Sequence, residues 1–198
     1  MNRIFSSIEI LRPLNMILCL LAVFISAWLV DGITSPLLPY TLLVVLCFAG
    51  ASNILNDVLD IHIDEVNRPD RVLPSGQFKI LDALIFMGVL YAVGILACTY
   101  LLPLGRKIAL FTVLPLLVLY TPLFKRIPFI GNFMIGGILG LVFLFTEGAI
   151  YGKMDKMWTP FFLATVLSTI RELAKDGADM AGDSTANLKT YPRKFGLI

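Results

Sequence analysis

Six long apolar stretches, separated by short polar connections, divide this sequence of 198 residues. They cover approximately residues 14–30, 37–55, 80–102, 108–124, 127–150 and 157–178. A helix needs about 20 mostly apolar residues to cross the hydrocarbon core of a bilayer, and a spanning segment must satisfy its backbone polar groups internally. The sequence therefore predicts an all-α fold: a polytopic transmembrane helical bundle of six spans that forms a single domain.

Composition supports an integral membrane protein and argues against a nucleic-acid partner. Only 15% of the residues are charged, whereas about 25% are charged in a typical soluble domain. The net charge of +2 is too small to indicate nucleic-acid binding. The cysteines Cys19, Cys47 and Cys98 lie in apolar stretches without the spacing of metal ligands, which predicts small core or lipid-facing residues.

A group of acids follows the second apolar stretch, between Asn53 and Gln77. We expect the helix of that stretch to continue to Asn67, because the next residues, Arg68 and Pro69, disfavour helix. At 100° per residue, five polar side chains share an arc of about 100°: Asn53, Asn56, Asp57, Asp60 and Asp64. Carboxylates on one helix face repel each other unless a cation lies between them, and oxygen ligands suit a hard divalent ion. The alternative is a solvated acidic loop.

A second group of acids ends the sixth apolar stretch. Glu172, Asp176, Asp179 and Asp183 fall within about 60° of one helix face, and both groups are expected on the same side of the membrane. Two carboxylate clusters that face one cavity can hold two or three Mg²⁺ ions around a diphosphate and neutralise that leaving group.

The basic residues predict the orientation of the spans. Twelve Lys and Arg residues lie on the side that carries the N-terminus and the acids, against four on the other side. Because short cytoplasmic loops carry an excess of Lys and Arg, we expect the acidic groups, and hence an active site, on the cytoplasmic side.

Two motifs resemble those of the UbiA superfamily of intramembrane prenyltransferases. N-D-x-x-D-x-x-x-D, which begins at Asn56 and is followed by NRPDRVLPSG, is similar to the first motif, and KDGADMAGD from Lys175 to Asp183 is similar to the second. Arg12-Pro13 and Lys125-Arg126 also fit. The resemblance implies a central cavity and Mg²⁺-dependent transfer of a prenyl group from an isoprenyl diphosphate to a lipophilic acceptor.

The resemblance also implies roles for individual residues. The Mg²⁺ ligands would be Asn56, Asp60, Asp64, Asp179 and Asp183, with Asp57 and Asp176 assisting. Asp60, Asp64, Asp179 and Asp183 would be the catalytic residues. Substrate would be bound by Asn56 and by the basic residues Arg12, Arg71, Lys125 and Lys189. Lys189, Arg193 and Lys194 follow the second motif and would either contact the phosphate of a glycerol phosphate acceptor or anchor the chain to anionic membrane lipid.

Within the superfamily, NRPDR-x-x-PSG together with RE-x-x-KD-x-x-D-x-x-GD is most similar to the digeranylgeranylglyceryl phosphate synthases. That likeness implies transfer of a geranylgeranyl group to geranylgeranylglyceryl phosphate in ether-lipid synthesis. Prenylation of an aromatic or quinone precursor, or of a chlorophyllide-like acceptor, remains an alternative. So does a non-catalytic transporter or an inactive truncated relative. The oligomeric state and the prenyl chain length are left open.

Four further expectations concern single positions and the length of the chain. Glu147 is expected to be an interfacial residue near the non-cytoplasmic end of its span, and His62 a helix-end residue that is not a ligand. Gly136, Gly137 and Gly140 are expected to serve helix packing. Because the family normally has nine helices, we expect its last helices to be missing from this chain.

Overall fold

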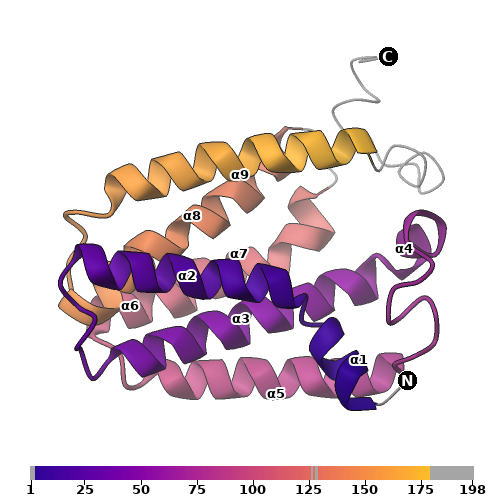
Figure 1. The fold of residues 1–198 in the computed structure, drawn as a ribbon, viewed down its shortest axis with the longest axis horizontal. Coiled ribbons are helices and arrows are strands. Elements are labelled where there is room, and N and C mark those ends of the chain that lie inside the picture. The colour runs from indigo at the N-terminus through magenta and orange to yellow at the C-terminus, as the bar shows by residue number, and fades with distance from the viewer. Residues whose placement is uncertain (1–2, 126, 128, 179–198) are drawn as a thin grey trace.

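A computed structural model describes residues 3–125, 127 and 129–178, and Figure 1 shows its fold. Every regular element in this described part is helical, which confirms the all-α prediction. The elements are α1 (Arg3–Glu9), α2 (Pro13–Leu29), α3 (Leu38–Leu59), α4 (Ile61–Asn67), α5 (Ile80–Cys98), α6 (Pro103–Ile108), the π-helix η1 (Ala109–Val113), α7 (Leu114–Leu119), the π-helix η2 (Tyr120–Phe124), α8 (Ile130–Tyr151) and α9 (Trp158–Ala178). The short helix α1 was not predicted.

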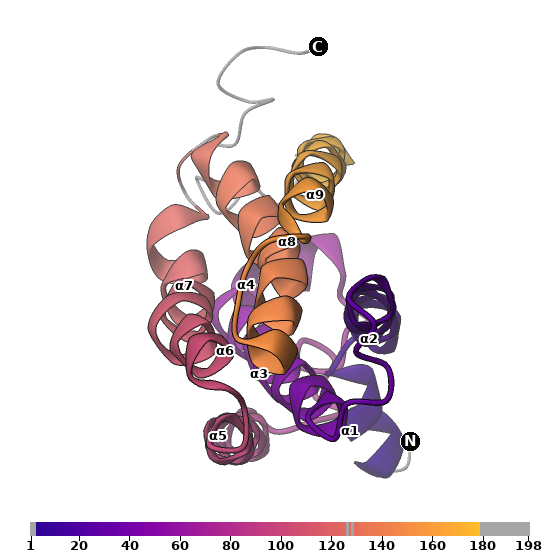
Figure 2. The same cartoon turned by 90° about the vertical axis from the view of Figure 1, so that its left-hand side faces the viewer.

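In the bundle of long helices, α8 contacts α2, α3, α6 and α9, and α5 packs against α3. Figure 2 turns this bundle so that α5 and α2 are seen nearly end-on. Its core includes Val23 of α2, Phe48 of α3 and Phe145 of α8, all nearly inaccessible to solvent. Large apolar side chains also cover the outside, for example Leu81 and Phe162. A broad apolar exterior of this kind fits the hydrocarbon of a membrane.

Within the described residues, four helical stretches are long and apolar enough to cross a bilayer: Leu38–Leu59, Ile80–Cys98, Pro103–Phe124 and Ile130–Tyr151. Helix α2 is apolar but has 17 residues. Helix α9 has 21 residues and carries the charged Arg171, Glu172 and Lys175 near its end. Each predicted stretch therefore contains a helix, while the count of six spans stays a prediction.

The acidic stretch does not form one continuous helix as expected. Helix α3 ends at Leu59, and Asp60 has φ −99° and ψ 8° before α4 begins in a new direction. The Asp60 N–H donates to the Asn56 carbonyl at 2.9 Å and the Asp64 N–H donates to the Asp60 carbonyl at 2.9 Å, so hydrogen bonds at Asp60 still join the two helices. The helix end at Asn67 is as predicted.

Two prolines shape the helical stretch 103–124. Pro115 follows the π-helix η1, and Pro122 lies inside the π-helix η2. Proline lacks the N–H that an α-helix needs, and the wider π turns carry the helix past both prolines. The Lys125 N–H donates to the Tyr120 carbonyl at 2.9 Å, five residues back. Single-turn π segments are frequent at functional sites, and η2 reaches the cavity described below.

Close packing of α8 on α9 depends on two of the three glycines. A Cβ atom at Gly136 would lie 2.3 Å from Thr169 Oγ1, and one at Gly140 would lie 2.4 Å from Thr165 Oγ1. A Cβ atom at Gly137 would meet nothing within 4 Å. The packing interpretation is therefore confirmed for Gly136 and Gly140 and wrong for Gly137.

Alanine at Gly136 or Gly140 is expected to push α9 away from α8. We expect each substitution to destabilise the protein by roughly 1–3 kcal/mol, the usual effect of overpacking. The matched control is Gly137→Ala, which adds the same methyl group to the same helix without a clash. Thermal unfolding in detergent measures the effect, and equal melting temperatures for the three variants would contradict the packing model.

The interpretation of Glu147 as an interfacial residue is wrong, because its side chain is only 1% exposed. Its carboxylate accepts hydrogen bonds from the backbone N–H groups of Asp155 (3.0 Å), Lys156 (3.0 Å) and Met157 (3.1 Å). Glu147 therefore holds the connection that leads into α9. His62, by contrast, has a side chain that is 90% exposed and lies beside Glu65, as expected of a helix-end residue.

Candidate active site

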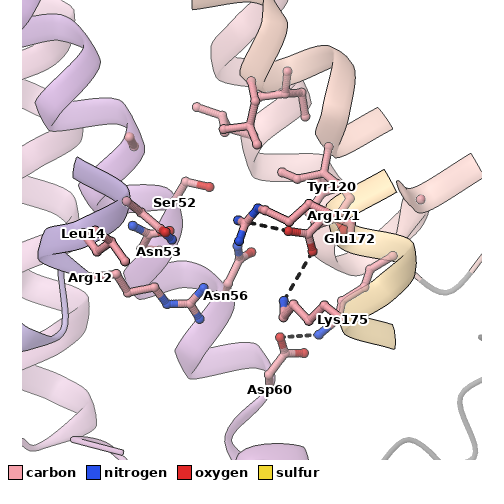
Figure 3. Close-up of a pocket in the computed structure, with 18 of the residues that line it drawn as sticks. Arg12, Leu14, Ser52, Asn53, Asn56, Asp60, Tyr120, Arg171, Glu172 and Lys175 are labelled. Atoms are coloured by element: carbon pink, nitrogen blue, oxygen red, sulfur yellow. Dashed lines mark hydrogen bonds and ion pairs between the residues drawn. The ribbon is translucent and has the colours of Figure 1, made fainter. Parts of the chain in front are cut away.

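A cavity of about 500 Å³ lies at one end of the bundle, where α2 begins and α3 and α9 end (Figure 3). Its size is within the range of small-molecule sites. Residues from α2, α3, α4, α7, η2, α8 and α9 line it. The sequence-predicted lining residues are Arg12, Asn56, Asp60, Asp64, Arg71 and Lys125. The fold thus brings these six residues together from four separate parts of the chain.

Two buried carboxylates of the first motif share one arginine. Arg71 Nη1 donates to Asp57 Oδ1 at 3.1 Å and also to Asp64 Oδ2. Asp57 Oδ1 accepts a second hydrogen bond, from Arg12 Nη2. Both acids are 7% exposed, and a buried acid is costly unless it is paired and hydrogen-bonded, so the two arginines reduce the cost of burying them.

The last turn of α3 is tied to the end of η2 by two further contacts. Lys125 Nζ, which follows η2, pairs with Asp60 Oδ2. Thr121 Oγ1, inside η2, donates to the side-chain amide oxygen of Asn56. Each pair joins residues 65 positions apart in the sequence. The π turn therefore presents two polar groups to the first motif.

The predicted metal ligands and the predicted diphosphate-binding cations are paired with each other. Asp57, Asp60 and Asp64 contribute three negative charges, and Arg12, Arg71 and Lys125 contribute three positive charges. This part of the site is electrically balanced. A metal ion and a phosphate group could each replace one partner in these ion pairs without leaving a charge buried alone.

Arg12 is held in an unusual backbone conformation at the edge of the cavity. It has φ 57° and ψ 74°, the left-handed region that non-glycine residues seldom adopt. Its Nε atom is buried and has no hydrogen-bond partner among the described residues. Strained residues cluster at functional sites, and an unpaired guanidinium donor in a cavity suits an anionic oxygen.

Helix α9 forms another wall of the cavity. Glu172 is 9% exposed and accepts from Arg171 at 3.2 Å and from Lys175 at 3.3 Å. Figure 3 shows these three side chains projecting from α9 into the cavity that Asp60 and Arg12 also line. Asp176 lies in α9, but its side chain is outside the described part of the structure. Asp179, Asp183 and Lys189 also lie outside the described residues, so their predicted roles stay predictions.

The donor chemistry of the first motif suits Mg²⁺. Carboxylate and amide oxygens are the ligands of hard divalent ions, and Mg²⁺ usually takes one or two carboxylates together with substrate phosphates. Among the described residues, no three His, Cys, Asp or Glu side chains are grouped as a metal site. The described carboxylates therefore fit a metal shared with a phosphate ligand better than a closed protein cage.

An apolar pocket of about 60 Å³ lies next to the cavity, deeper in the bundle. Phe48 of α3 and Val142 and Phe145 of α8 are among its lining residues. Five residues line both spaces: Cys19, Ala49, Leu117, Ile138 and Leu139. The site therefore has a charged end and an apolar inner side, which suits a ligand with a charged head and a hydrocarbon tail.

Sequence reasoning missed several residues that line or support the site. Tyr120 and Asn132 line the cavity, and Thr121 contacts Asn56. A signal was present in the sequence, since Tyr120 and Thr121 are polar residues between Pro115 and Pro122 and lie five and four positions before Lys125.

Comparison with known proteins identifies the family. Residues 16–197 match the model of the UbiA prenyltransferase family. The chain belongs to this family. This UbiA family chain is 41% identical over 155 residues to digeranylgeranylglyceryl phosphate synthase of Methanosarcina mazei, covering 78% of the chain and 53% of that relative. It is 34% identical to the Natronomonas pharaonis enzyme of the same name, covering 99% of the chain and 71% of the relative. The chain thus spans about half the length of the first relative.

Solved structures agree with the family assignment. A structure from work on digeranylgeranylglyceryl phosphate synthase in membranes has a TM-score of 0.82 and 29% identity, covering 99% of this chain and 70% of that one. A UbiA homolog from Archaeoglobus fulgidus bound to DMAPP and Mg²⁺ has a TM-score of 0.76 and 17% identity, covering 96% of this chain and 69% of that one. The second likeness establishes the fold.

Proposed function

We propose that this UbiA family protein transfers a geranylgeranyl group from an isoprenyl diphosphate to geranylgeranylglyceryl phosphate in ether-lipid synthesis. The observation that carries the proposal is the cavity, which combines carboxylates and cations at one end with an apolar pocket at the other. Two relatives named digeranylgeranylglyceryl phosphate synthase support this acceptor class. The A. fulgidus homolog, which binds DMAPP and Mg²⁺, supports a diphosphate donor.

The residues of the cavity divide into two sets with different roles. Asn56, Asp60 and Asp64 would hold Mg²⁺ together with the diphosphate, and the second motif would complete the site. Arg12, Arg71 and Lys125 would contact the phosphate oxygens. When bound, Mg²⁺ would supply positive charge to the departing diphosphate. Lys189, Asp57, Asp176, Asp179 and Asp183 keep the roles that the resemblance implies.

The chain's own groups act by binding, charge stabilisation and exclusion of water. The bond between the prenyl carbon and the diphosphate oxygen breaks, and its electron pair leaves with the diphosphate. Arg12, Arg71 and Lys125 stabilise the negative charge that develops there. The allylic cation lies against apolar walls such as Leu117 and Ile138, which keep water away. The acceptor hydroxyl oxygen then forms the new carbon–oxygen bond, and its proton passes to the diphosphate that has left.

The proposed orientation places the cavity on the cytoplasmic side of the membrane. Exposed Gln77 lies in the connection after α4, at the cavity end of the bundle, and exposed Thr34 lies in the connection between α2 and α3. A cysteine at Gln77 is expected to react with an impermeant reagent only from the cytoplasmic side, and one at Thr34 only from the opposite side, in a background without the native cysteines. Reaction of both positions from one side would refute this topology.

The function is tested directly by product analysis. Membranes that contain the protein are incubated with labelled geranylgeranyl diphosphate, Mg²⁺ and separate acceptors: geranylgeranylglyceryl phosphate, 4-hydroxybenzoate and chlorophyllide. We expect a digeranylgeranylglyceryl phosphate product that disappears when EDTA removes Mg²⁺. An aromatic or chlorophyllide product in its place would overturn the acceptor class. Absence of product with every acceptor would overturn the proposed function.

A further inference from the structure

Thr121 differs from other helical threonines of this protein in the partner of its hydroxyl group. Four threonines donate to the backbone carbonyl four residues earlier in the chain, within their own helix or at its N-cap: Thr41, Thr146, Thr165 and Thr169. The hydroxyl of Thr121 instead donates across to the amide oxygen of Asn56, on another helix. Thr121 is 5% exposed, so water is not a ready substitute for this contact.

The contact is a consequence of the π turn. Thr121 and Pro122 lie in η2, where the Lys125 N–H bonds to the carbonyl five residues back. Thr121 and Lys125 then meet Asn56, on the last turn of α3, and Asp60, which directly follows α3 and lies four residues after Asn56. The end of α3 and η2 are therefore joined by two contacts with the same spacing along both segments, one ionic and one neutral.

Asn56 needs an external contact to hold its side chain in one orientation. The terminal torsion of asparagine is broad and roughly two-fold, and its amide has an oxygen that accepts and a nitrogen that donates. Asn56 lines the cavity. A ligand there meets a defined group only if the amide plane is fixed, and the Thr121 hydroxyl is the contact that fixes it.

We infer that Thr121 is a positioning residue, which orients the Asn56 amide toward the diphosphate and its Mg²⁺ without touching either. The inference rests on the proposed binding of a prenyl diphosphate in the cavity. It predicts that Thr121 acts on ligand affinity through Asn56 and through no other residue. It also predicts that the hydroxyl group, and not the methyl group, is required.

The test measures Mg²⁺-dependent binding of geranylgeranyl diphosphate by calorimetry, without any acceptor, so that the readout is independent of turnover. Thr121→Val keeps the shape of the side chain and removes the hydroxyl. We expect it to weaken binding about threefold to tenfold, the range of interhelical hydrogen bonds in membrane bundles. Thr121→Ser should bind like the wild type. The matched control is Thr41→Val, because Thr41 is also buried but its hydroxyl donates to the Leu37 carbonyl, at the start of its own helix.

A double-mutant cycle decides whether Thr121 acts through Asn56. In the Asn56→Ala background, adding Thr121→Val is expected to have no further effect on binding. Additive losses would overturn the inference, as would wild-type affinity in Thr121→Val. Loss of the folded protein in Thr121→Val, with normal binding in Thr121→Ser, would assign Thr121 to the fold and also overturn it. If the wild-type protein does not bind the diphosphate at all, the proposed function fails instead.

Discussion

Replacement of Asp60 by asparagine is expected to lower prenyl transfer by about a hundredfold to a thousandfold, the usual effect of losing one electrostatic group at a reacting centre. Asp60 lies in the cavity and pairs with Lys125. Asparagine keeps the size of the side chain, but it removes the charge that would hold Mg²⁺ and balance Lys125. The measurement is turnover of labelled geranylgeranyl diphosphate over a range of Mg²⁺ concentrations.

The control for this prediction is another carboxylate of the same region. Glu65 lies in α4, has a side chain that is 54% exposed, and pairs only with His62 among the contacts described. Glu65→Gln should retain nearly full turnover. Melting curves of both variants show whether the fold is kept. Turnover above about one tenth of the wild-type rate in a folded Asp60→Asn protein would argue against the proposed role of this carboxylate.

Replacement of Glu147 by leucine is expected to destabilise the protein by about 3 kcal/mol, because three backbone N–H donors lose a charged acceptor that is itself buried. One carboxylate accepts from three successive N–H groups at the entry to α9. For a protein of this size, such a loss corresponds to a fall in melting temperature of roughly 6–12 °C. The melting temperature of Glu147→Gln should lie between those of the wild type and Glu147→Leu, since the amide retains one accepting oxygen.

The same connection contains a control for Glu147. Asp155 has a side chain that is 62% exposed and pairs with Lys153 at 3.0 Å. Asp155→Asn also removes a carboxylate, but an exposed ion pair contributes little to stability, so its melting temperature should stay near that of the wild type. If Glu147→Leu and Asp155→Asn have the same melting temperature, the hydrogen bonds that Glu147 accepts do not stabilise the protein.

The positions of the helices could be predicted from the sequence because a membrane restricts what a spanning segment can be. Lipid offers no hydrogen bonds, so each segment must be apolar and helical over a sufficient length. The same local reasoning predicted the end of α4 at Asn67, where Pro69 follows closely. The break at Asp60 was not predicted, because no proline or glycine marks it.

The residues of the candidate site were also largely predicted, since charged groups at the ends of apolar segments are costly without a role. Their pairing was not. Arg12 meets Asp57 across 45 residues, and Lys125 meets Asp60 across 65. A sequence shows that a cation and an acid are both present, but the approach of two helices decides which of them touch.

By itself, the sequence determined the helical membrane architecture and the kind of chemistry that its polar residues can perform, because hydropathy and helical spacing are local properties. Only the tertiary structure decided the environment of individual side chains. Glu147 is buried because its partners are backbone N–H groups, which every residue except proline has and which no pattern distinguishes. Gly136 and Gly140 face α9 and Gly137 does not, because the rotation of α8 about its axis is set by all its neighbours together.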